Sequence, residues 1–209
     1  MSKARAKKIK VILFDVDGVL TDGTIWIVPS HGRGGPVDAK ALEAVADQGG
    51  YSISSPDFTE SKGFHAHDGT GITLARLAGL KTGLITKRMS QVVALRARDL
   101  KIDHVYQGQA DKLSAMEKIA AAEGVKPAEI AFLGDDIVDL PVMRKCGLAM
   151  AVKNSRPEVL KEAHYVTPSK GGEGAARDAV EYILRAQGRL KKIVDAYVES
   201  RPAAQKSSV

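Results

Sequence analysis

The sequence predicts an α/β fold, a doubly wound and mostly parallel sheet with helices on both faces. Short apolar runs alternate along the chain with helical patterns, and the runs are apolar at consecutive positions, as in strands buried on both faces. The chain has 209 residues, of which 44% are hydrophobic, so it can bury a substantial core as one domain.

The predicted elements follow one another in a regular order. The runs expected as strands are 11–16, 81–86, 103–108, 129–135, 148–152 and 164–167. The helical patterns are 71–79, 90–100, 112–124, 138–147, 155–163 and 175–190. Ser90 and Ser155 stand where helix N-caps are expected, and Gly79, Gly124 and Gly147 stand where helices should end.

Residues 24–64 interrupt this order. We expect the runs TIWIV (24–28) and KGFHAH (62–67) to form a small β-hairpin flap. The span between them is rich in Gly, Ser and Pro at its ends, and its middle, 37–47, could form a short amphipathic helix. We therefore predict a flexible insertion at 29–60, and no cap domain.

The remaining boundaries follow from this pattern. One domain is predicted over 9–190, preceded by a basic tail at 1–8 and followed by a C-terminal tail at 191–209, whose residues 199–209 are expected to be disordered. The formal net charge of +6 lies largely at the two ends, where no aromatic residues or base-reading motif accompany it. We therefore expect solvated ends and no nucleic-acid partner.

The chain contains no apolar run long enough to span a bilayer, so no membrane partner is expected. Its single cysteine, Cys146, can form no internal disulfide and is predicted to be a buried structural thiol. Both observations favour a cytoplasmic protein.

Polar residues stand where the predicted strands end. They are Asp15 and Asp17 after the first strand, Thr86 after the second, Lys112 at the start of the helix that follows the third, and Asp135 and Asp136 after the fourth. Because α/β folds bind ligands at the carboxyl ends of their parallel strands, we expect these side chains to converge.

These residue types suit phosphoryl transfer. Carboxylates gathered at one edge form an oxygen-rich site for a hard cation such as Mg²⁺, which would also offset the repulsion between Asp15 and Asp17. Lysine and threonine supply donors for phosphate oxygens. Two like charges about 4 Å apart cost about 4 kcal/mol at an effective dielectric of about 20, so a carboxylate needs such help to attack a phosphate.

Each feature also has a structural explanation. Asp17 before Gly18 is compatible with an ordinary turn, Asp135 and Asp136 with a helix N-cap pair, and Lys112 with a solvated side chain. A phosphoacceptor receiver domain is an alternative with similar residues. Its phosphorylated aspartate typically ends the third strand, whereas this third strand ends in YQGQ.

Four features in order resemble the haloacid dehalogenase superfamily of phosphatases: DVDGV (15–19), the strand-end Thr86, Lys112 and GDDIVD (134–139). The resemblance implies a fold of the haloacid dehalogenase type. It also implies that Asp15 is the nucleophile that forms an aspartyl-phosphate.

The same resemblance implies the remaining catalytic roles. Asp17 would protonate the leaving alcohol and then activate water, while Thr86 and Lys112 would hold the phosphoryl oxygens. Mg²⁺ would be bound by the carboxylates of Asp15 and Asp135 and by the backbone carbonyl of Asp17. Asp136 and Asp139 would support these ligands from behind.

Further motifs are similar to the 3-deoxy-D-manno-octulosonate 8-phosphate (Kdo-8-P) phosphatase family. They are DGVLTDG (17–23), FHAHDGTGI (64–72), VYQGQADKL (105–113), GDDIVDLPVM (134–143), GGEGAARD (171–178) and AQG (186–188). Members are small, capless, Mg²⁺-dependent homotetramers that feed the sugar acid Kdo into lipopolysaccharide biosynthesis. The interval from Thr86 to Lys112 is filled by one strand and one helix, so no large cap fits there.

This family resemblance implies a set of substrate contacts. They are His65, Ala66, His67, Asp68, Gly69, Thr73, Arg88, Arg96 and Lys112. Arg88 and Arg96 are eight residues apart, so we expect them on one helix face, where both could meet a sugar-acid carboxylate. Arg96 could equally be solvated, and His65 and His67 could be surface histidines; neither is expected to bind metal.

The chain departs from the family pattern at several positions. Lys87 stands where glycine is usual, Thr73 where arginine is common and Glu173 where a basic residue is frequent, and the insertion at 29–60 is longer than the usual hairpin. We predict a Mg²⁺-dependent phosphomonoesterase that hydrolyses Kdo-8-P. The alternatives are a phosphatase of another nonulosonate phosphate and an accessory subunit of the phenylphosphate carboxylase type.

Overall fold

A computed structural model describes residues 2–29, 51–52 and 58–199. Its centre is a six-stranded sheet with the order β10-β9-β8-β1-β5-β7, in which every pairing is parallel. The strands are β1 (Val11–Phe14), β5 (Lys81–Ile85), β7 (His104–Tyr106), β8 (Ile130–Gly134), β9 (Leu148–Ala151) and β10 (Tyr165–Val166). The predicted doubly wound α/β fold is confirmed.

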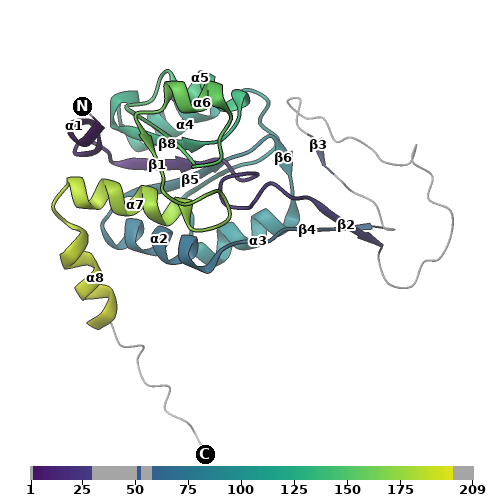
Figure 1. The fold of residues 1–209 in the computed structure, drawn as a ribbon, viewed down its shortest axis with the longest axis horizontal. Helices are drawn as coiled ribbons and strands as arrows, with labels where there is room; N and C mark the ends of the chain where they lie inside the picture. The colour runs from purple at the N-terminus through teal and green to yellow at the C-terminus, as the bar shows by residue number, and fades with distance from the viewer. Residues whose placement is uncertain (1, 30–50, 53–57, 200–209) are drawn as a thin grey trace, which may run out of the picture.

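Helices cover both faces of this sheet (Figure 1). The lower layer in that view contains α2 (Ala66–Leu77), α3 (Gln91–Leu100) and α7 (Ala175–Ala186). The upper layer contains α4 (Lys112–Glu123), α5 (Leu140–Met143) and α6 (Pro157–Glu162). The predicted helix over 138–147 is thus reduced to the short α5 and the 3₁₀ turn before it. Helix α2 begins five residues before its predicted start.

Strand β1 divides the core into two parts. Its four residues are all fully buried, and successive side chains point to opposite faces. Ile12 and Phe14 pack with the α2 and α7 side, whereas Val11 and Leu13 pack with the α4 side. The continuous apolar run that predicted this strand therefore reflects burial on both faces.

The predicted hairpin exists, but its second arm differs from the prediction. Strand β2 (Trp26–Pro29) pairs antiparallel with β4 (Phe58–Ser61), and the pair projects beyond the central sheet (Figure 1). The run KGFHAH at 62–67 instead leads into α2, because the side chain of His65 caps that helix by accepting a hydrogen bond from the backbone of His67. The helix considered at 37–47 and most of the insertion lie outside the described residues.

A second two-stranded pair lies beside the hairpin. In it, β3 (Tyr51–Ser52) runs parallel to β6 (Arg88–Met89). Strand β6 is short because Ser90 begins α3, so Arg88 precedes that helix. The expectation that Arg88 and Arg96 share a helix face is therefore wrong.

The basic side chains at the described ends of the chain are exposed, as expected, but the segments that carry them form helices instead of mobile tails. Residues Ser2–Ala6 form α1, and Leu190–Glu199 form α8. The side-chain amide of Gln187 donates hydrogen bonds to the carbonyls of Ala6 and Ile9, which holds the N-terminal segment against the end of α7. These segments contain many charged residues, but they also contain a few apolar ones that pack on the core. The predicted disorder at 199–209 falls almost wholly outside the described residues.

Among the helices of the described ranges, none combines the length and the hydrophobicity that a membrane crossing requires.

Candidate active site

The carboxyl ends of three adjacent strands meet at one pocket. Strands β5, β1 and β8 are neighbours in the sheet, and they are followed by Thr86, Asp15 and Asp135. The pocket has a volume of about 260 Å³ and is lined by Asp15, Asp17, Ile25, Thr86, Lys87, Arg88, Lys112, Asp135, Asp136 and Val138. The predicted convergence of strand-end residues is confirmed.

Lys112 occupies the centre of this site. Asp111 caps α4 by accepting hydrogen bonds from two backbone amides, which places Lys112 in the first turn. Its ammonium is buried and lies 2.6 Å from Oδ2 of Asp15 and 2.7 Å from Oδ1 of Asp139. Burial opposes the charge of Lys112, but the two carboxylates outweigh this effect and raise its pKa.

Asp139 supports the site from beneath. It is fully buried, and its Oδ2 accepts hydrogen bonds from the backbone of Asp135 at 3.0 Å and of Asp136 at 3.4 Å. Asp136 is the N-cap of the turn at Ile137–Asp139, which agrees with the structural explanation of this residue as a helix cap. Asp139 therefore fixes the loop after β8 and orients Lys112.

Within the pocket, the ionised forms of Asp15 and Asp135 are the most strongly disfavoured. Burial, followed by the charge of Asp139, raises the pKa of Asp15 to about 7, even though Lys112 opposes the shift. Burial, followed by the charges of Asp15 and Asp139, raises the pKa of Asp135 to about 8. The site thus favours a proton or another cation between these carboxylates.

The donor set fits a magnesium ion. Carboxylate oxygens of Asp15, Asp135 and Asp139 lie within 4.8 Å of one another, and hard cations prefer such ligands. Both oxygens of Asp139 are already hydrogen-bonded, whereas Oδ1 of Asp135 is buried without a hydrogen-bond partner in the described part of the chain. Asp15 and Asp135 are therefore the better candidates for ligands.

Gly18 makes the close approach of the two loops possible. Its φ of +86° is in the left-handed region, and a Cβ atom there would lie 2.2 Å from Oδ2 of Asp135. The glycine-rich run at 171–174 then packs on this loop. A Cβ atom on Gly171 would lie 1.7 Å from the carbonyl oxygen of Gly18, and the amide of Gly172 donates to the carbonyl of Val19.

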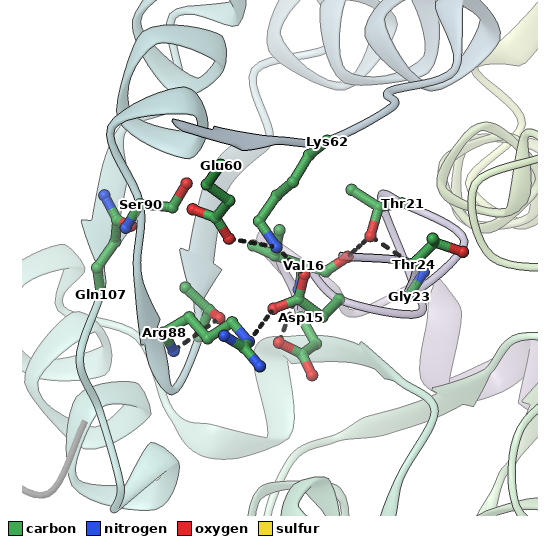
Figure 2. Close-up of polar contacts among 12 residues, drawn as sticks. Asp15, Val16, Thr21, Gly23, Thr24, Glu60, Lys62, Arg88, Ser90 and Gln107 are labelled. Atoms are coloured by element: carbon green, nitrogen blue, oxygen red, sulfur yellow. Dashed lines mark hydrogen bonds and ion pairs between the residues drawn. The ribbon is translucent and has the colours of Figure 1, made fainter. Parts of the chain in front are cut away.

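Asp17 lies on the hairpin side of the pocket, where the structure shows two partners that the sequence analysis missed. Its Oδ1 forms a short ion pair with Lys62, whose ammonium also lies 3.2 Å from Oε1 of Glu60 (Figure 2). Oδ2 of Asp17 lies 3.5 Å from Nε of Arg88. Glu60 and Lys62 are two residues apart along an extended segment, a spacing that places both on one face.

Thr86 is buried at the base of the pocket. Its backbone amide donates to the carbonyl of Tyr106, and its hydroxyl oxygen accepts from the amide of Arg88. Its carbonyl accepts from the amide of Gln109, so the loop after β7 holds the loop after β5 in place.

The structure does not bring the other predicted substrate contacts to this pocket. Arg96 lies against the start of α2, with its guanidinium carbon 5.7 Å from the centroid of the Phe64 ring. A Cβ atom on Gly69 would lie 2.8 Å from Nη2 of Arg96, so the glycine permits this packing. The hydroxyl of Thr73 donates to the carbonyl of Gly69.

The remaining members of this group also face the helix layer. His65 caps α2, Ala66 is its first residue, and the ring of His67 meets that of His65 edge-on at 4.7 Å. Asp68 is buried, and its Oδ1 accepts from the backbone amide of Arg177 at the start of α7. Asp68 is therefore a helix cap for α7.

The class of protein follows from this fold and site. Residues 83–177 match the family model described as haloacid dehalogenase-like hydrolase. The parallel sheet and the loop that carries Asp15 and Asp17, termed the DxD loop, fit this class, and the family match decides against the receiver-domain alternative.

Comparison with individual proteins narrows the family. The Kdo-8-P phosphatase of Yersinia pestis is 36% identical over 187 residues, which cover 90% of this chain and 86% of that protein. The chain therefore belongs to the 3-deoxy-D-manno-octulosonate 8-phosphate phosphatase family.

Solved structures agree with this assignment. A probable YrbI family phosphatase from Pseudomonas syringae matches with a TM-score of 0.78 and 38% identity, over 95% of this chain and 98% of that one. The Kdo-8-P phosphatase of Moraxella catarrhalis, solved with magnesium, phosphate and Kdo, matches with a TM-score of 0.76 and 31% identity, over 93% of this chain and 97% of that one.

Proposed function

We propose that this protein is a Mg²⁺-dependent phosphomonoesterase that hydrolyses Kdo-8-P to Kdo and phosphate. The observation that carries the proposal is the buried contact of 2.6 Å between Lys112 and Asp15 at the strand edge that also presents Asp135. Its likeness to the Yersinia pestis and Moraxella catarrhalis enzymes supports the choice of substrate.

The first half-reaction transfers the phosphoryl group to the protein. An oxygen of Asp15 attacks phosphorus as the bond from phosphorus to the ester oxygen breaks. Asp17, which is protonated for this step, gives its proton to that oxygen, so that the product leaves as an alcohol. Lys112 orients the Asp15 carboxylate and offsets its charge. The hydroxyl of Thr86 is free to donate to a phosphoryl oxygen, since it serves only as an acceptor for Arg88 in the described contacts.

The second half-reaction restores the enzyme. Asp17, now ionised, takes a proton from water, whose oxygen attacks phosphorus and releases inorganic phosphate together with the Asp15 carboxylate. Asp15, Asp135 and the backbone carbonyl of Asp17 would hold Mg²⁺, with Asp136 and Asp139 supporting the loop behind them. When bound, the ion supplies positive charge that offsets the repulsion between carboxylate and phosphate.

Residues that contact the sugar part of the substrate are expected close to the phosphoryl-transfer site. Arg88 lines the pocket and supplies a guanidinium suited to a sugar-acid carboxylate. The segment His65–Gly69, Thr73 and Arg96 is retained as a substrate-binding group by family resemblance. Because these residues lie outside the pocket of one subunit, their role requires an approach from a neighbouring subunit.

We also propose a homotetramer. Trp26, Ile27 and Val28 on β2 are 61%, 51% and 42% exposed, so apolar residues are accessible on both faces of this strand, which projects from the body of the protein (Figure 1). Exposed apolar residues on a projecting strand favour association with another copy. Sedimentation equilibrium tests this proposal, and a monomeric mass at assay concentration would contradict it. A cytoplasmic location is proposed from the sole, buried cysteine, Cys146.

A phosphatase panel tests the proposed activity. Purified protein is incubated with Kdo-8-P, other sugar-acid phosphates and hexose phosphates, with Mg²⁺ or with EDTA, and released phosphate is measured. We expect the largest kcat/KM for Kdo-8-P and loss of turnover in EDTA. Preference for another nonulosonate phosphate would overturn the substrate, and inactivity of the isolated protein would favour the accessory-subunit alternative.

A further inference from the structure

We propose that Lys62 is a positioning residue that holds the carboxylate of Asp17 and ties it to the β2–β4 hairpin. The inference rests on the proposed phosphatase function, in which Asp17 is the proton donor. Lys62 follows β4 directly, so the position of its ammonium depends on the hairpin.

The contacts of Lys62 form a buried charge cluster. Its side chain is 0% exposed, and its ammonium bridges Oδ1 of Asp17 and Oε1 of Glu60. In Figure 2 the Lys62 side chain descends from the hairpin segment into the site, with the Glu60 carboxylate beside its ammonium. A buried lysine is costly unless it is paired, so this contact is built into the fold.

Asp17 is held from both of its oxygens. Lys62 contacts Oδ1, and Nε of Arg88 lies 3.5 Å from Oδ2. The two cations come from separate segments, one directly after β4 and the other in β6, so the position of the carboxylate depends on both. Asp15 is fixed differently, by Lys112 and by the backbone amide of Val16.

This arrangement has a consequence for catalysis. A general acid must lie within hydrogen-bond reach of the leaving oxygen, and a small displacement of a catalytic group can cost about 100-fold in rate. Without Lys62, neither Oδ1 of Asp17 nor Oε1 of Glu60 would have its ammonium partner. Asp17 would lose the contact that fixes its position beside the leaving group, whereas the Asp15 and Lys112 pair would keep its geometry.

The test compares leaving groups that do and do not need a proton. Single-turnover rates of the first step are measured for Lys62→Met with Kdo-8-P, whose leaving group is an alkoxide, and with 4-nitrophenyl phosphate, whose leaving group departs as a stable anion. We expect the rate with Kdo-8-P to fall about 100-fold and the rate with 4-nitrophenyl phosphate to fall less than about 3-fold. KM for Kdo-8-P should stay within about 3-fold of wild type.

A matched control is available at the opposite edge of the sheet. Lys81 also bridges two carboxylates, Asp103 at 3.3 Å and Glu123 at 3.6 Å, and it begins β5. Lys81→Met should leave both rates unchanged. If Lys62→Met does not fold, the double variant Glu60→Gln, Lys62→Gln replaces the buried ion pair with neutral amides and should show the same selective loss.

The outcomes separate this inference from the proposed function. Equal loss on both substrates, or no loss on either, in a variant whose thermal midpoint and Mg²⁺ affinity match wild type would overturn the role of Lys62. Failure of the wild-type protein to hydrolyse either phosphate would instead overturn the phosphatase proposal itself.

Discussion

The two aspartates of the DxD loop are held by different parts of the molecule. The side chain of Asp15 is 8% exposed and is fixed by elements of the central sheet and by Lys112. The side chain of Asp17 is 23% exposed and is held by Lys62 and Arg88, from the hairpin and from β6. The sheet thus positions the group proposed to attack phosphorus, while peripheral segments position the group proposed to protonate the leaving oxygen.

The largest effect is expected from the sheet side. Asp15→Asn removes the proposed nucleophile, so kcat should fall by about 10⁴-fold or more with Kdo-8-P and with 4-nitrophenyl phosphate alike. Single-turnover assays check this prediction. Asp17→Asn should retain formation of the aspartyl-phosphate from the nitrophenyl ester. Residual turnover by Asp15→Asn near the wild-type rate would contradict the nucleophile assignment.

On the sheet side of the site, Lys112→Met should lower both the stability of the protein and its activity. Removing this ammonium leaves Asp15 and Asp139 buried and facing each other, which should cost about 3 to 5 kcal/mol in the free energy of unfolding. Urea denaturation in EDTA measures this cost. The control is Lys81→Met, whose lysine is half exposed and which should lower the free energy of unfolding far less. Equal costs for the two variants would count against a central role for Lys112.

Two glycine substitutions extend the comparison to the loop that follows β1. Gly18 and Gly23 have φ of +86° and +84°, so alanine at either position should cost about 1 kcal/mol in backbone strain. Only at Gly18 would the added Cβ atom collide with Asp135, since at Gly23 it would have its nearest contact at 3.5 Å. Gly18→Ala should therefore lower Mg²⁺ affinity measured by calorimetry, while Gly23→Ala should not. Equal affinities would show that the loop accommodates the methyl group.

The last prediction is a dependence of stability on pH. In the folded protein the pKa of Asp15 is about 7 and that of Asp135 about 8, against 3.8 for an ordinary aspartate. The folded state therefore keeps protons that the unfolded state has lost, and the stability of the metal-free protein should fall as pH rises from about 4 to about 8. Mg²⁺ replaces these protons, so the thermal midpoint should gain more from Mg²⁺ at pH 8 than at pH 6. Differential scanning fluorimetry measures both, and an equal gain at the two pH values would argue against the coupling.

The difference between the sheet side and the hairpin side of the site also explains which contacts could be predicted from the sequence. Asp15, Thr86 and Asp135 follow continuous apolar runs, and parallel strands bring their carboxyl ends to one edge, so local pattern was sufficient. The partnership of Lys62 with Asp17 spans 45 residues, and a charged side chain on a hairpin looks solvated in a sequence. The cap that Asp68 provides for α7 spans 109 residues and has no local pattern either.

The packing of the glycine-rich run at 171–174 against Gly18 and Val19 has a consequence for how the chain tolerates truncation. No residue of this run lines the described pocket, yet it forms one wall of the loop that carries both aspartates. Removal of the chain beyond residue 170 would take away this wall together with α7, whose apolar side chains belong to the core, so it should unfold the domain as well as loosen the loop.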